Sequence, residues 1–552
     1  MFRKVLIYGV TGATVVGTAV SLHRHEYQID ALALVRVSRA ASTVLQIGYC
    51  YKTQLYSKGL DNTTDEYFEL RNKVHKICAE KLLELCKQNK GVYIKVGQHI
   101  GALDYLLPME YVNTMKVLHK DAPQNTIPQL FRVIREDLKQ EPNDIFTKFE
   151  EQPLGTASLA QVHKAQLRDG TTVAVKVQHY FVKGNTRADI RSMEYLVRFM
   201  SWAFPDFDMQ WLVNETKANI FRELDFLEEA RNSEKIAVMF RNYPWLKIPK
   251  VFWEYSTDRV LVMEFVEGGQ VNDVNYIDPF DLCRKLGDLY SHMIFVNGFV
   301  HSDPHPGNIL IKKEPQDKEV TVYLLDHGLY ANLTDDFRYH YSQFWLSIIN
   351  RNQAAMKLHA AKMGIDDKMY GALACMVTGR PWTAIIDGIG QVKPNSTERD
   401  LIKKELPDVI NQISLCLQKI DRQALLLLKT NDLLRCIEYT LETSQEMCGF
   451  RVMTKCCLVS VYNQQLKKSD TSFQKMFLIV AKAWTVFKFY LVMTCIDLRA
   501  KFLRGTVHST DMFLDFHGQK YFRYLFMGCY AVLRQTLAKE GGSATGHNPK
   551  NK

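Results

Sequence analysis

Two segments in the first half of the chain alternate apolar and polar positions as β-strands do. Residues 171–178 carry β-branched side chains at alternating positions directly after the turn pair Asp169-Gly170. Residues 259–266 form a second, mainly apolar run that leads into a glycine-rich bend. The pattern therefore predicts a strand in each segment, and Lys176 lies close to the end of the first.

Longer segments around these strands are rich in helix-forming residues. Residues 61–145 contain long runs of Leu, Lys and Glu, and residues 187–204 and 211–240 have a similar content. Most of the chain after residue 266 has the same character. A few strands among many helices predict an α+β fold.

Two apolar stretches lie near the C-terminal end, at residues 476–480 and 486–496. Lys482 and Lys488 interrupt them, which is unfavourable for a segment that crosses a membrane. We therefore predict that these stretches pack in a protein core.

A third apolar run lies at the N-terminus, where residues 5–22 are uncharged and follow Arg3 and Lys4. This run is marginally long enough to span a bilayer. Small residues recur in it at four-residue spacing, which suits close helix packing in lipid. A membrane anchor, a secretory signal, an import segment and a buried core helix all remain possible readings of this run.

Composition places the chain among globular proteins and excludes some functions. The 552 residues are 47% hydrophobic and 24% charged, which suits two to three domains. The net charge of +10 is spread along the chain, so it can favour an anionic membrane surface but does not predict nucleic-acid binding. The 12 cysteines form no Cys-x-x-Cys pair, which indicates a reducing compartment and argues against structural zinc.

The chemistry of the chain is concentrated in two short segments, residues 301–308 and 324–328. Asp303 is followed five residues later by Asn308, and Asp326 lies between an apolar run and a glycine. This is the layout of a phosphoryl-transfer site, in which Asp303 accepts a proton from a hydroxyl or orients it, and Asn308 and Asp326 hold magnesium. Magnesium prefers such oxygen ligands. The alternative is a Pro/Gly loop whose Asp and Asn only cap turns.

Upstream of this site, residues 154–162 resemble the phosphate-covering loop G-x-G-x-x-G-x-V, with two of its three glycines replaced by alanine. Alanine restricts the loop, so we expect a stiffer phosphate cover than glycine would give. The predicted nucleotide-binding residues of this loop are Gly155, Thr156, Ala157, Ser158, Ala160 and Val162.

Lys176 can reach nucleotide phosphates if a carboxylate on a neighbouring helix holds it. Asp225 and Glu229 lie four residues apart and share a helix face, but a solvated acidic face is the ordinary explanation for either. The backbone of Glu264 and Val266 is expected to hydrogen-bond adenine, at the end of the second strand.

Together these segments resemble the UbiB (AarF-domain) family of atypical kinases over roughly residues 60–440. Lys95-Val-Gly-Gln98 matches the K-x-G-Q motif of this family, and Glu223-Leu-Asp225 matches its E-x-D motif. The same alignment implies that Glu229 pairs with Lys176. The resemblance implies a two-lobed protein-kinase-like fold with helical N-terminal and C-terminal extensions, and ATP and Mg²⁺ as ligands.

In this family the N-terminal extension folds over the place where a protein substrate would lie. The resemblance implies that Lys95 and Gln98 enter the active site and interact with Glu223 and Asp225. Burying Lys95 without a carboxylate partner would be costly, and the two acids supply one. We therefore expect ATP hydrolysis, or transfer to a small molecule such as a lipid or a quinone-like compound, rather than phosphorylation of other proteins.

The match is closer to a branch of the family found in animal mitochondria. In that branch Asp326-His-Gly replaces the more usual D-F-G, and Gly155-Thr-Ala-Ser158 replaces an all-alanine loop. His327 alters the apolar packing that sets active and inactive states, and Gly155 is expected to restore some flexibility. The resemblance implies a mitochondrial location at the inner membrane, with residues 5–22 as a retained anchor or a cleaved presequence.

Three functions fit these observations: an atypical kinase or ATPase, a nucleotide-binding pseudokinase scaffold in the mitochondrial membrane, and a protein Ser/Thr kinase. The first is the main prediction, because the chain contains every polar residue that a phosphoryl-transfer site needs. These residues are Lys176, Glu229, Asp303, Asn308 and Asp326. The predicted organisation is a targeting and tether segment at 1–60, a helical extension at 61–145, an N-lobe at 146–265, a C-lobe at 266–400, a helical C-terminal extension at 401–535 and a disordered tail at 536–552.

Overall fold

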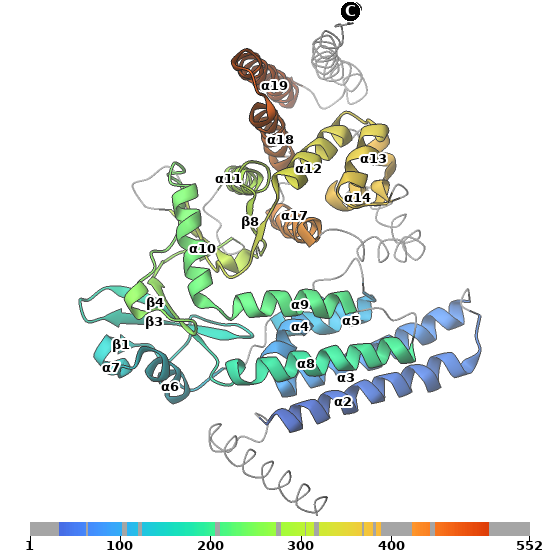
Figure 1. Cartoon of the computed structure of the whole chain (residues 1–552), viewed down its shortest axis with the longest axis vertical. Coiled ribbons are helices and arrows are strands. Elements are labelled where there is room, and N and C mark those ends of the chain that lie inside the picture. Colours follow the sequence, from blue (N-terminus) through green and yellow to red (C-terminus); the bar gives the residue numbers. More distant parts are fainter. Residues whose placement is uncertain are drawn as a thin grey trace, which may run out of the picture. The chain divides into compact units, whose positions relative to one another are not determined.

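The computed structural model divides the chain into two compact units (Figure 1). The first comprises Met1–Gly269 with Asn308–Leu329, and the second comprises Gln270–Gly307 with Tyr330–Lys552. The structure describes residues 32–61, 64–101, 107–119, 124–204, 210–271, 278–303, 305–313, 320–366, 369–378, 382–387, 422–441 and 448–506. The predicted anchor at 5–22, the tail at 536–552 and the start of the predicted C-terminal extension lie outside these ranges.

Helices before and after the first sheet pack together in the first unit (Figure 1). A buried cluster that includes Leu85, Tyr93 and Met115 lies among them. The Arg36 guanidinium forms a bidentate ion pair with buried Asp189, with 2.9 Å between Nε and Oδ1. The helical segments are α2 (Ala33–Cys50), η2 (Tyr51–Leu55), η3 (Tyr56–Lys58), α3 (Asp65–Asn89), α4 (Val92–Gly101), α5 (Met109–Met115), η4 (Lys116–His119), α8 (Val182–Ala203) and α9 (Gln210–Glu223).

A five-stranded antiparallel sheet follows the N-terminal helices, and it contains both strands predicted from the sequence. Its strands are β1 (Phe146–Phe149), β2 (Gly155–Thr156), β3 (Ala160–Leu167), β4 (Thr172–Gln178) and β6 (Val260–Glu264), in the order β1-β3-β4-β6 with β2 beside β3. Alternate valines of β4 pack on α6 (Ile127–Leu138), which α7 (Pro142–Ile145) connects to the sheet. This burial explains the period-two pattern of residues 171–178.

Helix α10 (Phe226–Met239) packs near the sheet through Phe226 and Ala230, which contact Leu261 of β6. The sequence predicted one helical segment over residues 211–240, but the structure divides it into α9 and α10. The break occurs because Asp225 leaves the helical conformation and caps the N-terminus of α10.

A second, four-stranded sheet has the order β5-β10-β9-β7, formed by β5 (Leu246–Lys247), β10 (Thr321–Leu324), β9 (Ile309–Lys312) and β7 (Gly269–Gln270). Strands β9 and β10 are antiparallel, with Ile309 opposite Leu324. The short helix η5 (Trp253–Tyr255) lies between β5 and β6 in the sequence. The β9–β10 pair matters for function because Asn308 and Asp326 lie at its open end.

The second unit is mainly helical, and its core includes Tyr290, Phe295 and Phe344. Its strands β8 (Phe299–His301) and β11 (Tyr330–Asn332) form a two-stranded antiparallel sheet. The helical segments are α11 (Pro279–Ser291), η6 (His292–Asn297), η7 (Pro306–Asn308), α12 (Asp335–Ile349), α13 (Gln353–Lys362), α14 (Tyr370–Thr378), α15 (Trp382–Asp387), α17 (Arg422–Thr440), α18 (Cys448–Lys468) and α19 (Ser472–Thr506).

The prediction that residues 476–480 pack in a core is wrong for most of that stretch. Leu478 is buried against the neighbouring helix, but Met476, Phe477, Ile479 and Val480 are exposed on α19. Among the described residues, none of the helices combines the length and apolar character needed to cross a membrane.

Candidate active site

A buried ion pair joins the first sheet to α10. The ammonium group of Lys176, on β4, lies 2.7 Å and 2.8 Å from the two carboxylate oxygens of Glu229, on α10. Both side chains are largely buried, with 13% and 4% of their surfaces exposed. The structure therefore brings together the two residues that the sequence paired, and Glu229 rather than another acid of the segment 223–229 holds the lysine.

Asp326 adds a second carboxylate to the same lysine. Its Oδ1 lies 3.5 Å from the Lys176 ammonium nitrogen, and 47% of its side chain is exposed. The backbone of Asp326 has a φ of 52°, in the left-handed region that Asp and Asn tolerate better than most residues. Such strained residues are concentrated at functional sites. The Gly328 N–H donates a hydrogen bond to Asp326 Oδ1 at 3.3 Å.

Asn308 is held beside Asp326 by the β9–β10 ladder. The N–H of Leu325 donates to the carbonyl of Asn308 at 2.8 Å, which extends the register that pairs Ile309 with Leu324. Two residues with oxygen-bearing side chains, from segments 18 positions apart in the sequence, thus lie at one end of the same hairpin. Carboxylate and amide oxygens are the donors that magnesium selects.

Asp326 and Asn308 offer the oxygen atoms that a magnesium site requires. Within the described part of the chain there is no group of three or more His, Cys, Asp and Glu residues that can hold a metal ion. Magnesium needs no such cage, because it is usually held by one or two protein oxygens together with substrate phosphates and water. Asp326 and Asn308 match that requirement.

The K-x-G-Q motif lies on α4, and its lysine reaches the edge of this site. The Lys95 ammonium group lies 2.7 Å from a carboxylate oxygen of Glu223, at the end of α9. Glu223 also contributes to the raised pKa of Lys176, so this second ion pair acts electrostatically on the first. The lysine of the N-terminal extension is therefore paired as the resemblance implied.

The other two predicted partners are placed differently. Gln98 donates its side-chain N–H to the carbonyl of Leu118 at 3.0 Å, and the Asp225 carboxylate accepts the backbone N–H groups of Leu227 and Glu228. These contacts close a bend and cap a helix, and the expected interactions of Gln98 and Asp225 with the opposite motif residues stay a prediction. Both side chains support the Lys95–Glu223 contact through the local fold.

The glycine of the same motif has a packing role. A Cβ atom added to Gly97 would come within 2.3 Å of the Leu118 side chain. Only glycine lets α4 approach the segment of Leu118 this closely. The motif thus places its lysine at Glu223 and uses its remaining positions to fix the helix that carries it.

The alanine-containing loop is a short hairpin with a closed tip. Gly155 and Thr156 pair with Val162 and Gln161 in the strand ladder. At the tip, the Ala157 N–H donates to the Ala160 carbonyl at 2.8 Å. This amide is used within the loop, whereas a phosphate-binding loop offers its amides to the ligand.

The hairpin tip is also anchored from outside. The His179 side chain donates through Nε2 to the carbonyl of Ala157 at 3.0 Å, and Ser158 and Ala160 are buried. The sequence analysis did not identify His179 as a residue of the site. The only indication in the sequence is that it directly follows the predicted strand at residues 171–178. These contacts restrain the loop, and the stiffness expected from the two alanines stays a prediction.

The structure narrows which backbone group of Glu264 can bind adenine. The Glu264 N–H already donates to the carbonyl of Lys250 at 2.8 Å, so the backbone of Glu264 can serve a base only through its carbonyl. Val266 follows two residues later and is half-buried. It remains the predicted second backbone contact.

Asp303 lies in the second unit, whereas Lys176, Glu229, Asn308 and Asp326 lie in the first. It is half-buried in the segment after β8, and its carbonyl accepts the N–H of His305 at 2.7 Å. Burial, with a smaller effect of the Asp303 charge, raises the pKa of Tyr290.

Known proteins share this chain's sequence along most of its length. Residues 117–360 match the model of the ABC1 atypical kinase-like domain. AarF domain-containing kinase 1 of Drosophila melanogaster is 52% identical, over 90% of this chain and 98% of that protein. The chain belongs to the ABC1 (AarF-domain) family of atypical kinases. AarF domain-containing protein kinase 1 of Mus musculus is 45% identical, over 91% and 96% of the two chains. ABC1 family protein MCP2 of Saccharomyces cerevisiae is 32% identical, over 86% and 87%.

Membership of the ABC1 family confirms the predicted fold class, an α+β kinase-like fold with helical extensions. It also offers one explanation for both ion pairs, Lys176–Glu229 and Lys95–Glu223. Lys176 on a strand and Glu229 on a helix form the kind of pair that kinases use. Lys95 and Glu223 belong to the family's own motifs.

The sequence reading also missed a link between α10 and the Asp326 segment. Asn232 donates to the carbonyl of His327 at 3.1 Å, and the backbone N–H of His327 donates to Glu229. Asn232 lies three residues after Glu229, on the same helix face, which is a signal that could have found it. The position of α10 and the conformation at Asp326 are therefore coupled.

His327 replaces an apolar residue of the usual family motif without leaving its own side chain unsatisfied. It is buried, and its Nε2 donates to the carbonyl of Leu324 at 3.1 Å. Burying a polar group is tolerated when it is hydrogen-bonded. In this conformation the histidine thus fills the position normally held by an apolar side chain.

Both members of the buried pair have a raised pKa, for Lys176 because carboxylates are near and for Glu229 because it is buried. Burial alone would lower the pKa of Lys176, but the carboxylates of Asp326 and Glu229 outweigh it and raise this pKa above its usual range. Burial raises the pKa of Glu229 to about 7, against the opposing effect of Lys176. Lys176 therefore stays charged at every physiological pH, while Glu229 titrates near neutrality.

Stability should consequently depend on pH through Glu229. Its pKa rises from 4.5 to about 7 on folding, so the unfolded chain loses this proton first as pH increases. The contribution of Glu229 to stability is complete below pH 4.5 and is lost as pH rises through about 7. We expect the unfolding temperature of the nucleotide-free protein to fall over this interval relative to Glu229→Gln. Parallel pH curves for the two proteins would contradict the assignment.

Gly328 and Gly155 differ in the space that is available for a side chain. A Cβ atom on Gly328 would lie 3.2 Å from Asp326 Oδ1 and 3.7 Å from Glu229 Oε2, whereas one on Gly155 would meet nothing within 4 Å. We expect Gly328→Ala to weaken nucleotide binding about tenfold, which corresponds to roughly 1.4 kcal/mol. Gly48→Ala, on α2, is the control, because a Cβ atom there makes only an ordinary contact, at 3.4 Å, outside the site, and it should change binding by less than about threefold. Titration with a fluorescent ATP analogue measures both. Equal effects would show that the space around Gly328 does not matter.

Proposed function

We propose that this protein binds Mg-ATP and catalyses ATP hydrolysis or phosphate transfer to a small or lipid-like molecule. The observation that carries this proposal is the placement of Lys176 between the carboxylates of Glu229 and Asp326, with Asn308 on the same hairpin as Asp326. The kinase-type pairing of a strand lysine and a helix glutamate serves to bind phosphates. Membership of an atypical kinase family supports the same chemistry.

Each residue has a role that follows from its contacts. Glu229 holds the Lys176 side chain in place, so that its ammonium group can contact nucleotide phosphates without a large loss of side-chain freedom. Asp326 and Asn308 would hold magnesium, which when bound neutralises charge on the phosphates. In the proposal Asp303 accepts the proton of the attacking hydroxyl, or orients it.

The choice of a small substrate rests on the N-terminal extension. The Lys95–Glu223 pair joins α4 to the end of α9, and the charge of Glu223 acts on the pKa of Lys176. We infer that α4, fixed in this position by Gly97 and Gln98, restricts access of a peptide to the site. Lipids and quinone-like compounds are therefore the proposed substrates, and phosphorylation of protein Ser or Thr is the weaker alternative.

We also propose a mitochondrial location at the inner membrane. The support comes from the uncharged run at residues 5–22 and from the resemblance to a mitochondrial branch at Asp326-His-Gly and Gly155-Thr-Ala-Ser158. Fractionation of cells that express the full chain, followed by protease protection of isolated mitochondria, tests this location. Recovery of the protein in the cytosolic fraction would refute it.

The experiment for the catalytic proposal is a screen of lipid and small-molecule extracts for stimulation of Mg²⁺-dependent ATP turnover. Stimulated turnover that is lost in Asp303→Ala would support the proposal. A pure, folded preparation that neither binds nor hydrolyses ATP in the presence of magnesium would refute it. Transfer of phosphate to a peptide library, also lost in Asp303→Ala, would instead favour a protein kinase.

One observation favours a second function, a nucleotide-binding pseudokinase scaffold. The Ala157 N–H is hydrogen-bonded within its own loop, and His179 holds the tip of the loop in place. This loop therefore has fewer free N–H groups for binding a triphosphate than a glycine-rich loop does. A scaffold predicts that Asp303→Ala restores function to cells that lack the protein as well as the wild type does. Failure of this variant to restore function would exclude the scaffold and support catalysis.

A further inference from the structure

Helix α19 carries an exposed apolar stripe among the described residues of the second unit. The large side chains on it recur at alternating spacings of four and three residues, so they share one helix face. Their exposed fractions are substantial, from 42% for Phe477 to 67% for Phe473. The stripe consists of Phe473, Phe477, Val480, Trp484, Phe487 and Leu491, with Met476 and Ile479 beside it.

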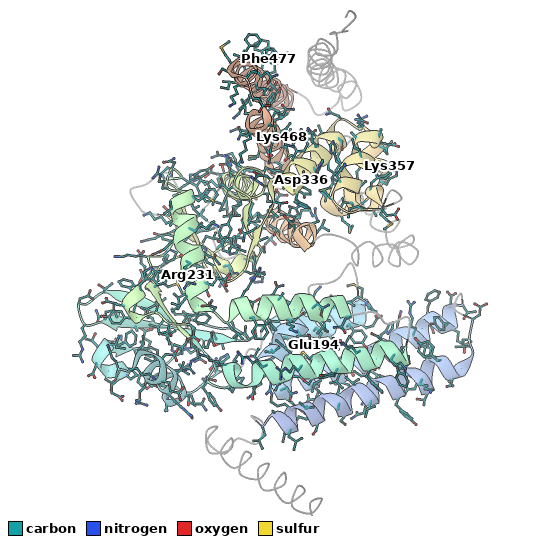
Figure 2. All side chains as sticks on the ribbon, in the orientation of Figure 1. Glu194, Arg231, Asp336, Lys357, Lys468 and Phe477 are labelled. Atoms are coloured by element: carbon teal, nitrogen blue, oxygen red, sulfur yellow. The ribbon has the colours of Figure 1, made fainter. Side chains whose placement is uncertain are left out.

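The opposite face of α19 is the one that packs against the unit (Figure 1). Leu478 and Phe489 are buried, Thr485 hydrogen-bonds the Tyr462 hydroxyl of α18 at 2.9 Å, and Lys482 donates to Asn463 at 2.8 Å. The helix is thus fixed to α18 by one face. Figure 2 shows Phe477 among the side chains that extend from α19.

The charges along this helix all have one sign. Residues 472–496 contain Lys475, Lys482 and Lys488 and no Asp or Glu. The ammonium group of Lys488 lies over the ring of Trp484, 4.9 Å from its centre. Such an arrangement keeps the aromatic ring and the cation together at the boundary between an apolar phase and water.

We propose that this face of α19, from Phe473 to Leu491, docks on the surface of a lipid membrane that carries anionic headgroups. Aromatic and aliphatic side chains insert at the level of the headgroups, and the lysines contact phosphate groups. The face is about 27 Å long, taking 1.5 Å per residue, so several lipids can contact it at once. The helix lies along the interface, because its opposite face is already packed against α18.

Charge favours lipid over a second copy of the chain. Two copies joined through this face would bring Lys488, at the edge of the stripe, close to its counterpart, with no acidic side chain on residues 472–496 to offset the charge. Like charges in close contact are unfavourable, whereas an anionic membrane supplies the missing negative charge. The proposal is independent of the catalytic site, which lies on other elements.

Sedimentation of the full chain with phosphatidylcholine vesicles, with and without phosphatidylserine, tests the proposal. The variant Phe477→Ser/Trp484→Ser/Phe487→Ser should bind the anionic vesicles at least about 100-fold more weakly, because it loses most of the inserted apolar surface. Lys488→Glu should bind more weakly than wild type only where phosphatidylserine is present. Leu358→Ser, on α13, is the matched control, because Leu358 is 55% exposed, as are Trp484 and Phe487.

Hydrogen exchange identifies the segment that binds, which matters because residues 5–22 are a second candidate for membrane contact. Vesicles should protect the backbone of residues 472–491 in the wild type and not in the triple serine variant. Vesicle binding without protection there would overturn the proposal. Protection that appears without vesicles and grows with protein concentration would assign the face to a second copy instead. Unchanged Mg²⁺-dependent nucleotide binding shows that the variants are folded.

Discussion

Asp326→Asn should reduce Mg²⁺-dependent nucleotide binding by at least about 100-fold, because it removes the formal charge at the proposed metal site. The substitution isolates that charge unusually well. Asp326 has a φ of 52°, and Asn tolerates the left-handed region as well as Asp does, so the backbone is not perturbed. The Asn side chain also has nearly the same size.

Titration of a fluorescent ATP analogue, with magnesium and with a chelator, measures this effect. Chelation should weaken binding to the wild type, and the two titrations should coincide for Asp326→Asn. Asp336→Asn is the matched control, because it makes the same charge change on an exposed residue of α12. Full magnesium dependence in Asp326→Asn would remove Asp326 from the metal site.

Glu229→Ala should lower the free energy of unfolding by about 3 kcal/mol, since it leaves the buried Lys176 with only the more exposed Asp326 at 3.5 Å. The double variant Lys176→Met/Glu229→Leu removes both buried charges and replaces them with apolar groups of similar size. We expect its stability to return to within about 1 kcal/mol of the wild type, because replacing a buried pair is often neutral. ATP turnover should nevertheless be absent.

Urea denaturation measures the stability of these variants, and ATP turnover is assayed on the same samples. The exposed pair Lys183–Asp258, at 2.6 Å, is the control, and Asp258→Asn should cost only about 0–1 kcal/mol. If the double variant is as unstable as Glu229→Ala, the pair contributes to stability beyond charge compensation. If it retains turnover, Lys176 has no role in catalysis.

Local sequence patterns were enough to predict the parts of the site that lie on regular elements. The alternating run at 171–178 identifies the strand of Lys176, and the acidic segment after residue 222 contains its partner. Asp225 was harder, because one motif match fits both an ion pair and a helix cap. The sequence Asp225-Phe-Leu-Glu228 also has the form of a capping box, which favours the cap that the structure contains.

Other features depend on distant segments and leave no local signal. Gln98 hydrogen-bonds Leu118 only because α4 packs on that segment, and Glu264 uses its amide because Lys250 lies beside β6. Helix α19 shows a further limit. Its two apolar faces give the sequence of a buried helix, and only the fold shows that one of them is uncovered.

The ion pair between Arg36 and Asp189 sets a boundary for maturation of the N-terminus. Asp189 lies inside α8 with almost no access to water, and Arg36 at the start of α2 neutralises it. A protease that cut after residue 36 would remove Arg36 and leave this buried carboxylate without its cation. Breaking a buried ion pair in this way lowers the free energy of unfolding by about 3–5 kcal/mol. Removal of a leader is therefore compatible with the fold only upstream of Arg36.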